Sequence, residues 1–373
     1  MSNNSAKNAS QIAKSRLESA KPRAGRPILL AAAMILTAII GLTIRGYFGH
    51  PGLEPALANA AQAEQPTAKA RQSGAAEKRR AAEEPLPPRN PLNGDRAYGY
   101  LKDICAIGRR VSGSAGMKSQ QELITKHFES LGGKVLRQEF TATDPRSGEQ
   151  VPMANLIISW HPDSKERVLL CAHYDTRPFP DRDPDPRKAR EGVFIGANDG
   201  ASGVAVMMEL AHLMPQVKGH FGVDFVLFDG EELVYAEGDE YFLGSKHFAR
   251  EHVRQPPAHK YRWGVLMDMV GDADLQIYQE QNSLSWPDTR PLVAQIWGLA
   301  QRMGVNEFVA RRGYLISDDH IALRNIAKIP TCDIIDFDYE SKWHTEADTP
   351  ENCSGASLAK VGWVVYEWMK RAD

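Results

Sequence analysis

Cysteine is scarce in this chain, and no two cysteines have the spacing of a metal or redox motif. The 373 residues include four cysteines, at positions 105, 171, 332 and 353. Because no Cys-x-x-Cys pair is present, the sequence argues against a zinc ribbon and against a thioredoxin-like site. Two interpretations of the four thiols stay open: disulfides, which an even count permits in an exported chain, or buried free thiols.

An excess of charge of either sign is also missing. The chain carries 45 basic and 47 acidic side chains, a formal net charge of -2, and its composition is 42% hydrophobic and 25% charged. This composition excludes collagen-like, fully disordered and multi-span membrane proteins, and the charge gives no footprint for a nucleic-acid partner. The charge is uneven, however. Residues 1–26 have six cations and one anion, a net charge of +5, so the remaining residues sum to -7.

Long apolar runs are absent with one exception, residues 27–44. These eighteen residues contain no charge and are closed by Arg45. As a helix they would measure about 27 Å, enough to cross the hydrocarbon core of a bilayer. Cations before the run and few after it predict a cytoplasmic N-terminus and a periplasmic or lumenal remainder. We therefore interpret residues 1–26 as a basic cytoplasmic tail and residues 27–44 as a single-pass signal anchor.

Two other interpretations of the apolar run are less consistent with its length and composition. A cleaved signal peptide would make the protein secreted, and Ala58-Asn59-Ala60 offers the small residues of a cleavage site, but it lies far beyond the end of the run. A buried core helix would need a polar face toward solvent, which the run lacks. Both alternatives to the anchor therefore fit the run poorly.

Large apolar residues are scarce between residues 45 and 95, where Ala, Pro, Gln, Glu and Arg dominate. Such a segment cannot bury a core, so we expect a flexible, disordered linker. Apolar periodicity begins near residue 96 and continues to the end, without an internal repeat. Residues 96–373 are therefore predicted to form one domain with a single core.

The pattern within residues 96–373 alternates strands with helices. Apolar runs of strand length occupy residues 135–141, 154–160, 168–172, 223–228 and 265–268, and helical spacing occupies residues 123–131, 201–214, 244–251 and 358–368. Buried strands that alternate with helices are typical of the α/β class. We expect a single three-layer domain in which helices flank a central mixed, mostly parallel sheet.

Acidic and histidine side chains stand at the ends of the predicted elements. His173, Glu231, Glu232 and Asp268 stand where predicted strands end, Asp199 stands at the start of the predicted helix 201–214, and His344 lies beside a turn near the C-terminus. In open α/β sheets the ligand site lies beyond the carboxyl ends of the strands, so we expect these side chains to meet. Imidazole and carboxylate without thiolate suit a catalytic zinc that keeps an open position. Of two adjacent glutamates, one would bind the metal while the other moves protons.

Five motifs in this order resemble the zinc aminopeptidase superfamily of bacterial leucyl aminopeptidases, which includes the glutaminyl-peptide cyclotransferases, or glutaminyl cyclases. They are HYD at 173–175, GANDGASG at 196–203, DGEE at 229–232, MDM at 267–269 and WHTEADT at 343–349. The resemblance covers roughly residues 97–373. It implies an aminopeptidase-like catalytic domain that acts on the N-termini of peptides or proteins.

The resemblance also implies roles for individual residues. In the cyclases a single zinc would fall on Asp199, Glu232 and His344, with Glu231 as the proton shuttle. Asp268 and Asp318 would be acidic partners in a hydrogen-bond network, Asp318 because Asp318-Asp319-His320 resembles the Asp-Asp-His segment of cyclases. In the dinuclear aminopeptidases His173 and Asp268 would complete a second zinc site, Asp199 would bridge the two ions, and Glu231 would be the general base.

Several features favour the cyclase branch. The segment between Asp175 and Asp199 and the eleven residues 233–243 are both longer than aminopeptidases usually have. Trp343 precedes the histidine as in cyclases, and Tyr339 falls where cyclases place an aromatic near the pocket mouth. We therefore expect both aromatic side chains to contact the substrate.

Other positions depart from the cyclase pattern. The segment 233–243 offers Tyr235 and Tyr241 where cyclases offer a tryptophan, and Asp333 replaces the histidine of animal cyclases. The disulfide beside the active site of animal cyclases has no counterpart here. These departures concern the pocket and leave the metal positions intact.

Two acidic groups near the first motif receive simpler interpretations. We expect Asp175 to orient the imidazole of His173 rather than to bind metal. Asp181, Asp183 and Asp185 alternate with Pro and Arg, which favours a solvated loop over a calcium site.

The resemblance implies a zinc enzyme that converts N-terminal glutamine to pyroglutamate with release of ammonia, and the apolar run at 27–44 predicts that it is tethered to a membrane; we expect a monomer. One zinc ion is expected for this activity. A zinc aminopeptidase with two zinc ions is the alternative. An inactive extracellular binding domain is a remote third possibility, because such a relative would be expected to lose metal ligands and none is missing.

Overall fold

The computed structural model describes residues 89–217 and 219–372. The predicted tail, the predicted membrane span and linker residues 45–88 lie outside the described residues and stay predictions. Within the described part of the chain, no helix combines the length and the apolar character needed to cross a membrane.

A six-stranded sheet forms the centre of the domain, in the order β1-β2-β4-β3-β5-β8. Its strands are β1 (Lys134–Thr143), β2 (Gln150–Trp160), β3 (Glu166–His173), β4 (Gly222–Phe228), β5 (Lys260–Asp268) and β8 (Thr331–Ile335). The pairs β1/β2 and β2/β4 are antiparallel, whereas β4/β3, β3/β5 and β5/β8 are parallel. The sheet is therefore mixed, as expected, with three parallel pairs out of five.

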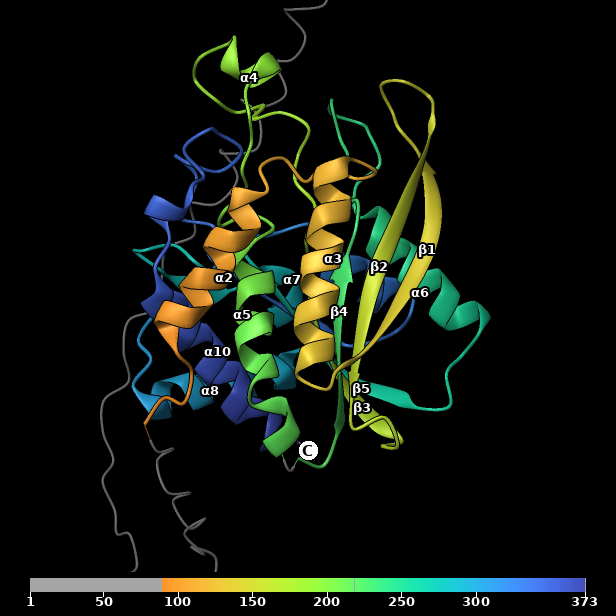
Figure 1. The fold of residues 1–373 in the computed structure, drawn as a ribbon. Helices are drawn as coiled ribbons and strands as arrows, with labels where there is room; N and C mark the ends of the chain where they lie inside the picture. Colours follow the sequence, from red (N-terminus) through yellow and green to blue (C-terminus); the bar gives the residue numbers. More distant parts are fainter. Residues whose placement is uncertain (1–88, 218, 373) are drawn as a thin grey trace, which may run out of the picture. The chain divides into compact units, whose positions relative to one another are not determined.

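Helices cover both faces of this sheet. One layer contains α2 (Gly94–Ala106), α3 (Ala115–Ser130), α5 (Ser202–Ala211), α8 (Arg290–Met303) and α10 (Gly355–Met369), and the opposite layer contains α6 (Leu243–Arg254) and α9 (Asp319–Asn325). In Figure 1, α2, α3 and α5 stand in front of the sheet and α6 lies on its other side. The α/β class and the flanking helices predicted from the sequence are thus confirmed.

Smaller elements complete the chain. They are α4 (Lys188–Glu191), α7 (Gln281–Ser285), the short 3-10 helices η1 (Met214–Gln216) and η2 (Pro350–Asn352), and the parallel pair β6 (Ile277–Gln279) and β7 (Phe308–Arg312). The segment that contains α4 connects β3 to α5.

Strand β3 shows why the central strands appear in the sequence as continuous apolar runs. Val168 and Leu170 pack into the core under α5 and α10, while Leu169 and Cys171 pack into the core under α6 and α9. Because both faces of the strand are buried, neither set can be polar.

The folded part of the chain begins earlier than the predicted boundary at residue 96. Helix α2 starts at Gly94, and its cap Asn93 accepts a hydrogen bond from the backbone N–H of Arg96. Upstream, the amide of Asn90 donates to the carbonyl of Ala359, and Leu92 is buried. The predicted linker therefore ends at least a few residues too late, because polar residues that look like linker in fact cap and dock α2.

All four cysteines lie in the described part of the chain, where they are free and buried. Of the two interpretations that the sequence left open, buried free thiols is the one the structure supports.

A buried ion pair holds the end of the sheet that is opposite the motif residues. The guanidinium of Arg167 donates to both carboxylate oxygens of Asp224, each at 2.7 Å, and the two side chains are 1% and 2% exposed. The hydroxyls of Tyr261 and Ser159 donate to the same carboxylate at 2.7 and 2.6 Å. Every oxygen of this buried charge is thus satisfied.

Asp224→Ala is expected to lower the free energy of unfolding by about 3–5 kcal/mol, because it leaves the guanidinium of Arg167 buried without its partner. Urea unfolding of the full chain measures the loss. Tyr261→Phe is the matched control, since it removes one hydrogen bond and should cost about 1 kcal/mol. A loss below 1 kcal/mol for Asp224→Ala would show that the pair does not hold this end of the sheet.

Candidate active site

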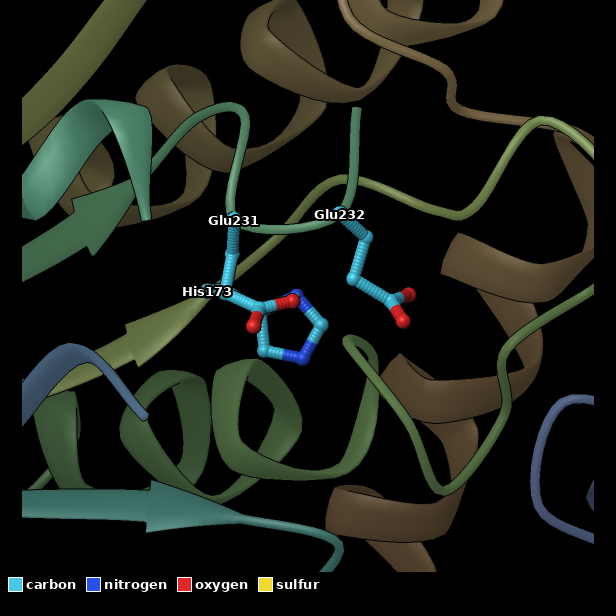
Figure 2. A group of neighbouring side chains, drawn as sticks. All are labelled: His173, Glu231 and Glu232. Atoms are coloured by element: carbon cyan, nitrogen blue, oxygen red, sulfur yellow. The ribbon is translucent and has the colours of Figure 1, made fainter. Parts of the chain in front are cut away.

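The motif residues meet at the carboxyl ends of three adjacent strands, as the sequence predicted. His173 is the last residue of β3 and Asp268 the last of β5, while Glu231 and Glu232 follow β4. Figure 2 shows the two glutamates extending from one loop toward the imidazole of His173. One oxygen from each glutamate and one nitrogen of His173 lie within 4.8 Å of one another.

Asp199, Glu232 and His344 form a group with the geometry of a metal site. Their ligand atoms lie within 4.8 Å of one another, and all three residues are buried. Nε2 of His344 is 2.9 Å from Oε1 of Glu232 and 3.4 Å from Oδ2 of Asp199. Oδ2 of Asp199 and Oε2 of Glu232 have no hydrogen-bond partner among the described residues.

These observations fit a bound cation. Two buried carboxylates with unpaired oxygens are costly without one. The surrounding acids also favour a positive charge at this place. Burial lowers the pKa of His344, but the negative charge of Glu232 and hydrogen bonds to Asp181 and Asp199 outweigh that effect and raise the pKa to about 10. Two carboxylates and one imidazole are the ligand set of a catalytic divalent metal with an open position. The residues present thus fit the predicted zinc.

A second cluster shares Asp199. Nε2 of His173 lies 3.1 Å from Oδ1 of Asp199 and 3.2 Å from Oδ1 of Asp268. These three residues also have ligand atoms within 4.8 Å of one another. These are the residues that would hold a second zinc ion in the aminopeptidase alternative of the sequence analysis.

Asp175 holds the loop that carries both glutamates. Its two carboxylate oxygens accept hydrogen bonds from the backbone N–H groups of Glu231 and Glu232, at 3.1 and 3.0 Å. Its distance to Nδ1 of His173, 3.6 Å, is longer than these. The sequence assigned Asp175 to His173 alone, whereas its closer contacts fix the turn that aims the glutamates.

Glu231 is not in the three-ligand group and is well placed to exchange protons. Its side chain is 12% exposed and lines the cavity above the site. Burial raises its pKa well above the ordinary value; the charges of Glu232 and Asp318 add to this shift and His173 opposes it. A carboxyl group whose pKa lies well above its ordinary value suits a general acid and base.

Asp268 and Asp318 line the same cavity. Burial raises the pKa of Asp268, and burial with the charges of Asp268 and Asp319 raises the pKa of Asp318 well above the ordinary value. Asp318 is also the N-cap of α9. The three acids predicted to form a network therefore open onto one cavity, and their protonated forms persist to higher pH than exposed carboxyls.

A further buried group lies behind Asp318. The carboxylate of Asp333 is completely buried, and its oxygens have no hydrogen-bond partner in the described ranges. Burial and the charge of Asp318 raise its pKa well above the ordinary value. The ring of His320 stands between Glu280 and Asp333, at 3.5 and 3.8 Å.

The cavity over the site has a volume of about 590 Å³. Its acidic lining comprises Asp181, Asp199, Glu231, Glu232, Glu237, Asp268 and Asp318, and its aromatic lining comprises Tyr241, Phe242, Phe337 and Trp343. The rings of Trp343 and Phe337 meet edge to face at 5.0 Å, and the guanidinium of Arg182 lies 4.2 Å from the Trp343 ring centre. Trp343 thus lines the cavity beside His344, and its contact with substrate stays a prediction.

Tyr339 lies elsewhere than predicted. It is 1% exposed and does not line the cavity; its hydroxyl donates to Asp348 at 2.9 Å. The carboxylate of Asp348 also accepts from the backbone N–H groups of Asn198 and Asp199. The expectation of a substrate contact at Tyr339 is corrected, because its hydroxyl finds a buried acceptor and the turn after β8 leaves Phe337 in the cavity wall.

Two functional candidates were missed by the sequence reasoning. Arg177 lies 3.1 Å from the carboxylate of Glu232, and Asp181 lies 3.4 Å from Nδ1 of His344. Asp181 does lie in a solvated loop, as interpreted, with its side chain 45% exposed, but its contact with His344 was not foreseen. Irregular loops carry no periodicity, so only the Arg and Asp four residues apart could have suggested the pair.

The chain is similar to proteins of known class. The family model for peptidase family M28 matches residues 155–369. The glutaminyl-peptide cyclotransferase of Bos taurus is 24% identical over 279 residues, which is 67% of this chain and 74% of the relative.

Two solved structures are also similar. The glutaminyl cyclase of Fimbriiglobus ruber is 44% identical, with a TM-score of 0.72, and the match covers 76% of this chain and 96% of that one. A leucine aminopeptidase precursor from Bacteroides thetaiotaomicron is 30% identical, with a TM-score of 0.71, and the match covers 76% of this chain and 99% of that one.

Proposed function

The chain belongs to peptidase family M28, and we propose that it is a zinc-dependent glutaminyl-peptide cyclotransferase. It converts the N-terminal glutamine of peptides to pyroglutamate and releases ammonia. The observation that carries this proposal is one cavity in which the three-ligand group, the half-buried Glu231 outside that group and two further carboxyl groups meet. The 44% identity to a bacterial glutaminyl cyclase, over nearly all of that protein, supports it.

The reaction forms one bond and breaks another within the same residue. The α-amine nitrogen of the glutamine attacks its own γ-carbonyl carbon, the bond from that carbon to the amide nitrogen breaks, and ammonia leaves. Because both reacting groups belong to one residue, proximity is already supplied. The protein must add charge stabilisation and proton transfer.

Each part of the site has a task in this reaction. A zinc ion held by Asp199, Glu232 and His344 would supply the positive charge that polarises the γ-carbonyl. Glu231 takes a proton from the attacking amine and gives one to the departing nitrogen. Nothing else is required to balance the protons, because the amine loses what the ammonia gains.

The remaining cavity residues hold the substrate and the protons. Asp268 and Asp318 border Glu231 and serve as its acidic partners, so that a proton can be shared among the three groups. Trp343, with Phe337 against it, offers an apolar wall for the methylene groups of the glutamine side chain. Tyr339 has no direct role in this scheme.

An aminopeptidase would use the same framework differently. Glu231 would then activate a water against the first peptide bond, and His173, Asp199 and Asp268 would hold a second metal ion. The ligand atoms of these three side chains lie close enough together to hold a metal ion, and this observation favours the aminopeptidase as the second candidate function.

Activity and metal content measured together distinguish the two functions. The purified full chain is offered one peptide that begins with glutamine and one that begins with leucine, and zinc is counted per chain. We expect pyroglutamate and ammonia from the first, no free leucine from the second, and one zinc. An N-acetylated glutamine peptide is the control, because it lacks the attacking amine. Release of leucine with two zinc ions would replace the cyclase with the aminopeptidase.

A further inference from the structure

The loop between β3 and α5 makes a closed ring of charged contacts with two of the metal ligands. Nη1 of Arg177 lies 3.1 Å from Oε1 of Glu232. The same guanidinium donates to both oxygens of Asp181, at 2.7 and 3.1 Å. Asp181 in turn lies 3.4 Å from Nδ1 of His344, whose Nε2 is 2.9 Å from Glu232. The ring therefore runs from one ligand through the loop to the other ligand.

The contacts that Arg177 and Asp181 make with the two ligands leave one atom of each ligand available to bind a metal. His344 turns Nδ1 to Asp181 and Nε2 to the ligand group. Arg177 contacts Oε1 of Glu232, while Oε2 has no hydrogen-bond partner in the described part of the chain. A carboxylate on the far nitrogen of a ligating imidazole fixes its tautomer and raises its basicity.

The loop also restrains the backbone that carries His344. His344 has a φ of 56°, a left-handed conformation that costs a residue with a side chain about 1–3 kcal/mol. The backbone N–H of Arg182 donates to the carbonyl of His344 at 3.1 Å. Two residues later, the N–H of Glu346 donates to the carboxylate of Asp183 at 3.0 Å. The strained turn is thus held by the same loop that touches its imidazole.

We infer that Arg177 and Asp181 are positioning residues for the metal. Asp181 keeps His344 in the tautomer that leaves Nε2 free, and Arg177 keeps Glu232 aimed at the metal through one oxygen. The longer segment between Asp175 and Asp199 then acts as the outer shell of the metal site. This inference rests on the proposed function only in requiring a metal on Asp199, Glu232 and His344.

Asp181→Ala in the full chain tests the inference through zinc binding itself. Its side chain is 45% exposed, so the substitution should fold. We expect zinc to bind about 10–100-fold more weakly, measured by competition with a chromogenic chelator. The spectrum of the cobalt-substituted protein should shift, and the unfolding midpoint of the metal-free protein should stay unchanged.

Two further variants separate the parts of this role. Asp181→Asn should recover part of the affinity, because an amide oxygen still accepts a hydrogen bond from Nδ1. Asp185→Asn is the matched control: Asp185 belongs to the same loop, but its carboxylate accepts from the N–H of Arg187, away from the ligands. It should bind zinc like the unaltered protein.

Unchanged zinc affinity and an unchanged cobalt spectrum in Asp181→Ala would overturn the inference. A variant that loses stability of the metal-free protein in proportion to its zinc affinity would also overturn it, since the loop would then be merely structural. None of these measurements uses a peptide. Failure of the unaltered protein to cyclise glutamine would therefore count against the proposed function only. The role of Asp181 would still be decided by the zinc affinity and the cobalt spectrum of its variants.

Discussion

Glu231→Gln is expected to lower kcat by about 100- to 10,000-fold, which is the usual contribution of a general acid and base. Glutamine has nearly the same shape as glutamate but cannot accept the proton of the attacking amine. Because Glu231 lies outside the three-ligand group, the variant should still bind zinc. The rate of ammonia release and the zinc content per chain are the two quantities to measure.

The matched control for this substitution is Glu240→Gln. Glu240 follows the paired glutamates in the same segment, but it is exposed and pairs with Lys246 at 3.0 Å. An exposed pair of this kind contributes little to stability, so the control should turn over normally. Normal turnover in Glu231→Gln would contradict the assignment of the proton carrier.

Removal of the metal should abolish cyclisation and destabilise the domain. Without a cation the unpaired oxygens of Asp199 and Glu232 remain buried. Binding to the folded state alone stabilises a protein by about 4 kcal/mol when the free ligand is about 1,000 times its Kd. For a domain of this size that corresponds to a fall in Tm of roughly 10 °C. Treatment with a strong chelator, followed by thermal unfolding with and without added zinc, measures it.

His344→Ala reproduces the loss genetically, because it removes the only nitrogen ligand of the three. The variant should bind little zinc and should not regain activity when zinc is added. His220→Ala is the control, since the imidazole of His220 is 68% exposed and pairs with Glu166 at the starts of β3 and β4, the ends opposite those that carry the motif residues. A metal-free protein that cyclises glutamine at the original rate would refute the zinc mechanism.

The parts of the fold that could be predicted are those with strong local patterns. Strands β3 and β4 are buried on both faces, so β3 leaves a continuous apolar run and β4 leaves one that only Asp224 interrupts. Strand β8 was missed because the buried Asp333 interrupts a run of only five residues. Helix α2 was missed in part because its glycines and charges resemble the preceding linker. Packing against α10 and α5 stabilises α2, and that contact is invisible in a local window.

The site residues that could be predicted are likewise those that lie next to a strong local pattern. His173, Glu231 and Asp268 could be brought together in advance, because each lies at or just beyond the carboxyl end of a strand and the strands are adjacent. Arg177 and Asp181 belong to an irregular loop whose path depends on what it packs against. Tyr339 shows the same limit, since the turn between β8 and His344 decides which aromatic side chain faces the cavity.

The four buried thiols determine how the domain responds to oxidants and reductants. Burial raises the pKa of Cys105 to about 12 and that of Cys171 well above the ordinary value. A thiol must lose its proton to attack a disulfide or a peroxide, so these groups are chemically inert while the domain is folded. The domain therefore needs no disulfide-forming machinery to reach its native state. Its stability should be the same at the redox potential of the cytosol as at that of an oxidising compartment.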